Sequence, residues 1–198
     1  MNQTEAAQVQ VSLGSHFGSP TRVASPMLLL ALSLFVFPGQ GGLQAQTSVE
    51  YKVKGVFLFK LSKFVEWPVG AFQPDAPFAI GILGDDPFGE ELDEICGGET
   101  ISGRDLVLRR GESLEELGDC QIVFLCRSEV REFPKILGEL QGRSVLTVAD
   151  SDTFIHAGGM INFVHRGKRI SFEINPQAAK KAGLRVSSQL LRLGIIKG

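Results

Sequence analysis

The segment Phe78-Ala-Ile-Gly-Ile-Leu83, followed directly by Gly84-Asp-Asp-Pro87, decides the fold class of this chain. A short apolar run that ends in a turn containing glycine and proline is typical of a buried strand. Asp86 is a favoured helix N-cap and Pro87 a favoured first helical residue, so we expect a helix to begin at Pro87. The segment therefore predicts a strand, a loop and a helix in succession.

The same succession recurs further along the chain. Strands are expected at Leu106–Leu108, Ile122–Leu125 and Val145–Val148. A capping box of Ser113 and Glu116 predicts one short helix, and Ser128 is expected to cap a second helix over Glu129–Leu140. Short strands that alternate with helices favour a mainly parallel sheet with helices on both faces. We therefore predict an α/β fold with a single, Rossmann-like, three-layer domain.

The C-terminal part follows a different pattern. Two strand-like runs, Met160–His165 and Arg169–Asn175, are separated by a turn containing glycine and predict a β-hairpin. Asn175 is expected to cap a helix that Gly183 ends, and a last short helix is expected over Ser187–Leu193. The hairpin adds an antiparallel element to the sheet.

A helix is also expected before the first strand. Apolar residues at spacings of three and four predict it over Val49–Trp67, and Pro68 ends it. Leu58, Phe59 and Trp67 add apolar surface beyond one packing face. Two interpretations follow: both sides of the helix are buried within the domain, or one side covers a partner protein.

The first 45 residues have the composition of a secretory leader. They contain only Glu5 and Arg22 as acidic or basic residues, and Met27–Phe37 is apolar apart from one serine. Such a run resembles the apolar region of a signal peptide, with cleavage expected near Ala45. A membrane-spanning helix needs about 20 apolar residues, so a buried helix or short anchor is the less favoured interpretation. Translation from Met1 and from Met27 are both compatible with export.

The mature domain is therefore predicted to comprise residues 46–198 and to be periplasmic. The whole chain has 20 Lys and Arg against 22 Asp and Glu, a formal net charge of −2, which argues against binding to nucleic acid. Its glycines match no nucleotide-binding fingerprint, and no histidines have metal-ligand spacing. We expect no cofactor and no metal.

Loops that follow parallel strands are the usual place for a ligand in an open α/β sheet. Here they are 84–86, 127–128 and 150–152. Asp85 and Asp86 are the candidate ligand-binding residues, with plain helix capping as the alternative interpretation. A small-ligand site at this edge is the second functional hypothesis.

The mature domain contains three cysteines, and export makes disulfides permissible. Cys96 and Cys120 are both expected at the amino edge of the sheet, so a Cys96–Cys120 disulfide is the intrachain pairing that the topology suggests. Cys126 lies about 20 Å further along an extended strand. It precedes a predicted helix N-terminus, where a reactive thiolate would be stabilised, but a buried core thiol is the favoured interpretation.

Several runs taken together resemble the YfiR family of exported bacterial proteins. They are Lys54–Pro68, Ile82–Gly89, Leu146–Asp150, Gly158–Phe163, Ile170–Asn175 and Ala182–Leu191. The resemblance implies a periplasmic α/β domain, often dimeric and without a catalytic centre. It also implies that the domain binds the sensor part of a membrane diguanylate cyclase and represses it. Our leading hypothesis adds redox state or a small ligand as a modulator of this regulator.

On this hypothesis the chain is a non-enzymatic regulator, and its partner contacts are expected on the first helix and near the C-terminus. The candidate contacts are Phe59, Lys63, Trp67, Arg185, Ser187, Ser188 and Gln189. Core packing of the aromatic residues and helix capping by the serines are the competing interpretations. A thiol enzyme that uses Cys126 is the least favoured function.

Overall fold

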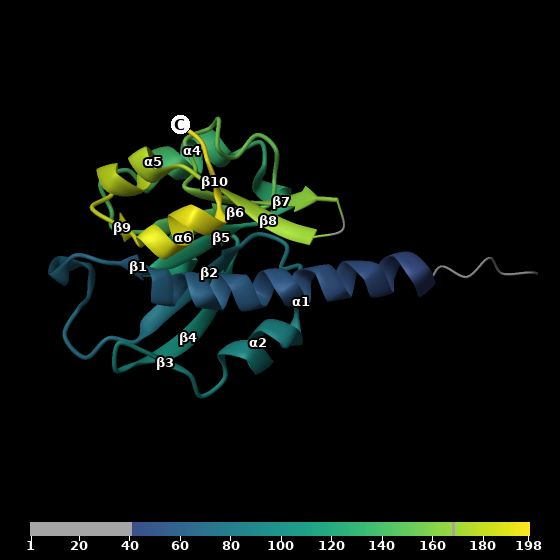
Figure 1. Cartoon of the computed structure of the whole chain (residues 1–198). Helices are drawn as coiled ribbons and strands as arrows, with labels where there is room; N and C mark the ends of the chain where they lie inside the picture. Colours follow the sequence, from purple (N-terminus) through teal and green to yellow (C-terminus); the bar gives the residue numbers. More distant parts are fainter. Residues whose placement is uncertain (1–40, 168) are drawn as a thin grey trace, which may run out of the picture. The chain divides into compact units, whose positions relative to one another are not determined.

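The computed structural model describes residues 41–167 and 169–198, and an eight-stranded sheet forms the centre of this part (Figure 1). The strand order is β10-β8-β7-β6-β5-β2-β4-β3. These strands are β2 (Phe78–Leu83), β3 (Thr100–Ile101), β4 (Arg104–Gly111), β5 (Ile122–Leu125), β6 (Leu146–Ala149), β7 (Ile161–Arg166), β8 (Arg169–Ile174) and β10 (Ile195–Ile196). The predicted α/β fold is confirmed.

The central strands of the sheet run parallel, as the alternation of strands and helices predicts. β4, β2, β5, β6 and β7 form four consecutive parallel pairs. β7 and β8 form the predicted hairpin, in register from Ile161 opposite Ile174 to Arg166 opposite Arg169. The edge strand β10 pairs parallel with β8, and β3 pairs antiparallel with β4 at the other edge.

Helices cover both faces of the sheet. They are α1 (Gly41–Phe64), α2 (Glu90–Cys96), α3 (Leu114–Leu117), α4 (Phe133–Glu139), α5 (Pro176–Lys181) and α6 (Ser188–Leu193), with short 3-10 turns η1 (Val69–Ala71) and η2 (Arg127–Glu129). Alternate residues of β2 enter the two cores: Ile80 packs with α1 and α2, and Leu83 packs with α3 and α4. All six residues of β2 are buried, and the strand lies in the interior of the sheet between β5 and β4.

Two predicted helix starts are wrong, and the physical reason is the same in both. α2 begins at Glu90 rather than Pro87, because the Asp86 carboxylate accepts a hydrogen bond from the Phe88 amide (2.7 Å) in a local turn. α4 begins at Phe133 rather than Glu129. The Ser128 hydroxyl accepts a hydrogen bond from the Asp85 amide (3.0 Å) and thereby joins two loops instead of capping a helix.

Three other predicted caps are confirmed. The Ser113 hydroxyl accepts from the Glu116 amide, the Asn175 side chain from the Ala178 amide, and the Ser187 hydroxyl from the Leu190 amide. The capping box is only half formed, because the Glu116 carboxylate accepts from the Glu112 amide instead of returning to Ser113.

The first helix ends at Phe64, three residues before the predicted end. Its next two residues form the short strand β1 (Val65–Glu66), which pairs antiparallel with β9 (Arg185–Val186). The predicted leader lies outside the described residues except for residues 41–45, which belong to α1. Among the described residues, no helix is both long and apolar enough to cross a membrane.

Candidate functional site

The predicted contact residues of the first helix lie around its C-terminal end. The Lys63 ammonium lies 4.3 Å from the centre of the Phe59 ring and 3.6 Å from the Glu99 carboxylate. The Trp67 indole donates a hydrogen bond to the Gln121 carbonyl (3.2 Å) and packs edge-on against a core phenylalanine. Phe59 and Trp67 are therefore half-buried, in agreement with the core-packing interpretation, while Lys63 stays exposed.

The C-terminal contact residues lie next to this end of α1. Glu66 of β1 is paired with Arg185 of β9, and the Ser187 amide donates to the Phe64 carbonyl (2.9 Å). Ser187 then caps α6, whose first turn exposes Ser188 and Gln189. The structure thus brings together two groups of predicted residues that are far apart in the sequence.

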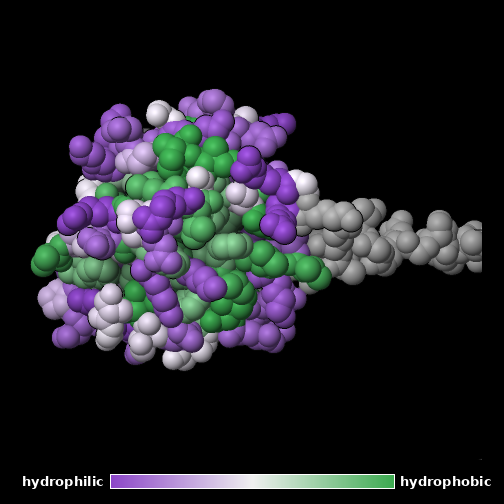
Figure 2. Space-filling model, viewed as in Figure 1, coloured by the Kyte–Doolittle hydropathy of each residue, from purple (hydrophilic) through white to green (hydrophobic). Residues whose placement is uncertain are grey.

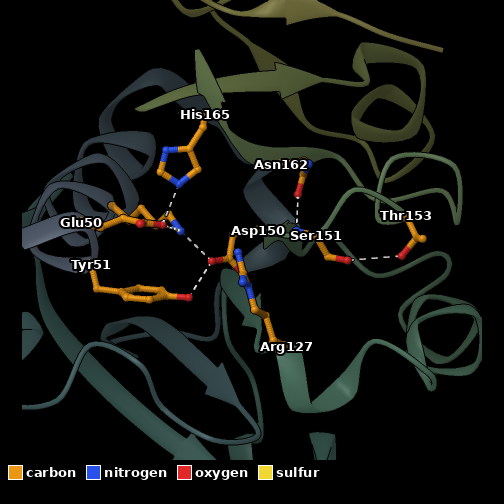
Figure 3. Close-up of polar contacts among 9 residues, drawn as sticks. Glu50, Tyr51, Arg127, Asp150, Ser151, Thr153, Asn162 and His165 are labelled. Atoms are coloured by element: carbon orange, nitrogen blue, oxygen red, sulfur yellow. Dashed lines mark hydrogen bonds and ion pairs between the residues drawn. The ribbon is translucent and has the colours of Figure 1, made fainter. Parts of the chain in front are cut away.

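A network of charged and polar side chains that the sequence analysis did not predict lies at the carboxyl edge of the sheet (Figure 3). Lys54 of α1 is only 1% exposed, and its ammonium lies 2.6 Å from the carboxylate of Asp150, which follows β6. The Tyr51 hydroxyl donates to the same carboxylate oxygen (2.7 Å), and the Arg127 guanidinium lies 3.3 Å from the other oxygen. Asp150 is therefore the centre of the network.

The network continues outward from Lys54 towards solvent. Lys54 also bonds to Glu50, one helical turn earlier, and the His165 imidazole of β7 lies 3.1 Å from the Glu50 carboxylate. Behind Asp150, the Ser151 amide donates to the Asn162 side-chain oxygen (2.9 Å) (Figure 3). The Asn162 nitrogen is buried and has no hydrogen-bond partner.

The electrostatics of the network favour one protonation state. Burial, and then the hydrogen bond to Asp150, raise the pKa of Tyr51, so the phenol stays neutral. Burial disfavours the charged form of Glu50, but the bonds from Lys54 and His165 outweigh it and lower the pKa of Glu50. Both oxygens of Asp150 already have partners, so this arrangement holds α1 on the sheet rather than presenting a free catalytic carboxylate.

The N-terminal half of α1 depends on this network. Between Val49 and Val56 the buried residues of α1 are Tyr51, Lys54 and Gly55. In its C-terminal half the buried residues are Leu58, Leu61 and Ser62. Lys54 lies four residues before Leu58 and seven before Leu61, which places it on the apolar side of the helix. A lysine at such a position needs a buried acid, and this was the signal in the sequence that could have revealed the network.

Residues 51–195 of the chain match the profile of the family described as YfiR/HmsC-like. This chain belongs to the YfiR/HmsC-like family. The match includes the network from Tyr51 to His165 and the paired strands β1 and β9.

A solved structure described as the ABC domain in complex with L-Trp from Streptococcus pneumonia is also similar to this YfiR/HmsC-like chain. It has a TM-score of 0.49 and 11% sequence identity, over 74% of this chain and 62% of that chain. This chain therefore spans less than two thirds of that protein's length.

The predicted ligand residues of the YfiR/HmsC-like domain lie in a separate cluster at the same sheet edge. Asp85 is exposed. Asp86 accepts from the Phe88 amide through one oxygen and from the Arg110 guanidinium through the other (2.7 Å). Arg110 also bonds to Asp93 (2.7 Å). Asp86 is thus engaged within the domain, and its ligand role stays a prediction.

The predicted Cys96–Cys120 disulfide is not formed. All three cysteines are free and buried. Cys96 packs in the core beneath α1 and α2, whereas Cys120 packs on the opposite face with Leu117. The prediction considered only the edge of the sheet at which each cysteine lies. The two cysteines lie on opposite faces of the sheet, which keeps their sulfur atoms apart. A β-carbon placed on Gly81, which points to the second face, would lie 3.0 Å from the Cys120 sulfur.

Cys126 has the environment of a core thiol. Its side chain is fully buried, and burial together with Asp86 and Asp150 raises the pKa of the thiol. A nucleophilic cysteine needs the opposite shift, toward the thiolate. Within residues 41–167 and 169–198, no three His, Cys, Asp or Glu side chains are grouped as a metal site requires.

Proposed function

We propose that this chain is a periplasmic, non-enzymatic regulator that binds the sensor part of a membrane diguanylate cyclase and represses it, so that cyclic-di-GMP falls. The observation that carries the proposal is membership of the YfiR/HmsC-like family over residues 51–195. This family is consistent with periplasmic regulation of such cyclases. The predicted leader supplies the route to the periplasm.

The site geometry supports a binding role. The predicted contact residues gather where α1, β9 and α6 meet, and Arg185, Ser188 and Gln189 are exposed there. By contrast, the charged residues that a reaction would use are bonded to one another, with both Asp150 oxygens engaged. This part of the molecule can contact a partner protein without rearrangement of the core.

Binding and repression are tested with purified protein of residues 46–198. The periplasmic domains of membrane cyclases from the same genome would be immobilised, and the cellular cyclic-di-GMP concentration measured with and without the gene. We expect one cyclase domain to be bound and cyclic-di-GMP to rise on deletion. The absence of any bound cyclase together with unchanged cyclic-di-GMP would refute the proposal.

A charge reversal tests whether the predicted contact residues take part. Arg185→Glu replaces the 3.7 Å ion pair with Glu66 by a like-charge pair, but the two side chains are 84% and 70% exposed, so the fold should tolerate the change. Lys135→Glu on α4, an exposed position on the opposite face, is the matched control. We expect only Arg185→Glu to weaken the complex; equal effects of the two variants would exclude this contact.

Export and oligomeric state are tested on the same material. Mass spectrometry of the protein from a periplasmic extract should give an N-terminus near Gln46, and an uncleaved chain in the cytoplasm would contradict the export. Light scattering of the purified domain checks the dimer that the resemblance implies.

A small-ligand-binding protein is the alternative function. A hollow of about 420 Å³ on the carboxyl side of the sheet is lined by Asp152, His156, Val164, Glu173 and Lys197 among others. A cell extract fraction that raises the melting temperature of the wild type would favour this alternative. Loss of the effect in Glu173→Gln would place the ligand in this hollow, and loss in Asp86→Asn would place it at the separate Asp86 cluster. No stabilisation by any fraction would argue against it.

A further inference from the structure

The outward side of α1 and the adjacent α6 form one surface, which we call the α1–α6 face. Val49, Val53 and Lys60 recur at helical spacing and share the side of α1 opposite its buried residues, and the half-buried Phe57 lies at the edge of this side. Figure 2 shows apolar residues over α1 and α6 with hydrophilic residues around them. Val53 is 39% exposed and Leu193 of α6 is 63% exposed.

The two helices are held together at this face. The Ser187 amide bonds to the last residue of α1, and Figure 1 shows α6 alongside the C-terminal half of α1. The Phe57 ring packs against Phe172 of β8 (5.9 Å between centres), over which the turn after α6 also passes, since a β-carbon on Gly194 would touch that ring. The α1–α6 face is therefore a continuous and well-supported surface.

The exposed charges of the α1–α6 face are basic. Lys52 and Lys60 on α1 and Arg192 on α6 are exposed, and among the described residues none of the three has an ion-pair partner within the domain. Glu50, the single acidic residue of α1, is bonded to Lys54 and His165 inside the network. The rim of this apolar surface thus carries uncompensated positive charge.

The net charge of the chain is close to neutral, but acidic and basic residues are distributed unevenly along the sequence. Residues 85–139 contain fifteen Asp and Glu against six Lys and Arg, whereas residues 140–198 contain three against nine. The acidic segment supplies α2, β4 and α3, and the basic segment supplies β7, β8, α5 and α6. Because the strand order puts β8 and β4 near opposite ends of the sheet, the charges are separated in space.

We propose that the α1–α6 face is the docking surface for the sensor protein, and that it receives a segment whose apolar side chains are flanked by Asp and Glu. This inference rests on the proposed function and specifies the chemistry of the partner. Apolar contact would supply the binding energy at the centre, and the basic rim would steer the acidic segment and set its register.

Charge complementarity favours this occupant over a second copy of the chain. Two α1–α6 faces placed together would bring Lys60 and Arg192 against like charges, which is unfavourable. An anionic membrane surface would match the charge, but surfaces that enter the lipid headgroup region commonly expose aromatic residues. The strongly exposed large apolar residues of the described chain are Val49, Val53, Val69, Leu193 and Ile196, without an aromatic residue among them.

The test measures the affinity of variants of residues 46–198 for the purified periplasmic domain of the cyclase that the wild type binds. Val53→Asp and Leu193→Asp place a charge at the apolar centre and should weaken binding at least about tenfold. Val69→Asp is the matched control, because Val69 is 97% exposed on η1, outside this face. Circular dichroism melting checks that all three variants stay folded.

Salt dependence tests the acidic nature of the partner segment. The wild-type affinity should fall as NaCl rises from 50 to 300 mM, and the Lys60→Glu/Arg192→Glu variant should bind weakly and lose this dependence. An Asp→Lys or Glu→Lys change in the partner should restore part of the binding to that variant. A wild-type affinity that does not change with salt would overturn the inference.

The possible failures can be told apart. If the wild type binds a cyclase domain and Val53→Asp weakens binding no more than Val69→Asp does, the α1–α6 face is excluded as the docking surface. The proposed function would remain intact. Absence of wild-type binding to every cyclase domain would refute both. Sedimentation of the wild type with phosphatidylglycerol vesicles tests the membrane instead. If Val53→Asp abolishes this sedimentation but leaves cyclase binding unchanged, the α1–α6 face is assigned to the membrane.

Discussion

Two clusters of ion pairs lie at the carboxyl edge of the same sheet, and they differ in their access to water. In the Asp86–Arg110–Asp93 cluster the side chains of Asp86, Arg110 and Asp93 are 16%, 36% and 52% exposed, respectively. In the Lys54–Asp150 network both side chains are only 2% exposed. Exposed charges that lose a partner are solvated by water, whereas buried charges depend mainly on their partners inside the domain. The two clusters should therefore respond very differently to the loss of one member.

The largest effect is expected from breaking the buried pair. Lys54→Met or Asp150→Leu alone leaves the other charge without its main partner inside the domain, and each should lower the free energy of unfolding by about 3–5 kcal/mol. Urea unfolding followed by circular dichroism measures this. Lys52→Met, an exposed lysine on the same helix, is the control and should change stability by less than about 0.5 kcal/mol.

The double variant Lys54→Met/Asp150→Leu sharpens the comparison. It removes both buried charges and should recover most of the stability that either single variant loses, because no uncompensated charge of the pair remains. If the double variant is instead destabilised by the sum of the two single effects, mutual compensation is not the reason why the pair is needed.

An intermediate effect is expected for Tyr51→Phe, which removes a hydrogen bond to the buried carboxylate. The loss should be about 1.5–3 kcal/mol near neutral pH. Because the folded state raises the pKa of Tyr51, the stabilisation is present below the ordinary value of 10.0 and declines as pH rises above it. The wild type should therefore lose more stability than Tyr51→Phe as pH rises from about 10 to 12, and parallel losses in that range would contradict the assignment.

Substitution of Glu50 should have a smaller effect on stability, and the pH dependence of that effect should run opposite to that of Tyr51→Phe. The pKa of Glu50 is lowered in the folded state, so its contribution is present above the ordinary value of 4.5 and is lost as pH falls through the lower folded value. Glu50→Gln should cost about 1 kcal/mol at pH 7 and flatten the acid side of the stability profile. Glu90→Gln, an exposed position, is the comparison variant and should leave that side unchanged.

The smallest effect is expected in the exposed cluster. Asp86→Asn keeps the oxygen that accepts from the Phe88 amide but removes the charge opposite Arg110. Stability should fall by less than about 1 kcal/mol, and 1 M NaCl should abolish most of the difference. A loss comparable to that of Asp150→Leu would show that exposure does not separate the two clusters.

Local patterns in the sequence were sufficient to predict the sheet but not every helix start. The apolar runs of β2, β5 and β6 are short, fully buried and unambiguous. Asp86 and Ser128 are good N-caps in isolation, but in the structure each has an equally good hydrogen bond to a loop amide. The choice between a cap and a turn depends on tertiary contacts, which a local pattern does not contain.

The candidate site was predicted in part for a similar reason. The contact residues near Trp67 and Arg185 were found from the pattern of apolar residues and caps, but their proximity depends on the pairing of β1 with β9. Lys54 and Asp150 are 96 positions apart, so neither residue alone indicates the other. The disulfide prediction failed because it considered the edge of the sheet but not its two faces.

The pairing of β1 with β9 also has a consequence for biosynthesis. Val65 and its partner Val186 are 121 positions apart in the sequence, so Val186 is synthesised long after Val65. Contacts between positions so distant in sequence raise the contact order and slow folding, because a long loop must close before they form. The end of the first helix can therefore acquire this strand pairing only after residue 186 has been synthesised, whereas the contacts of the same helix with α2 can form earlier.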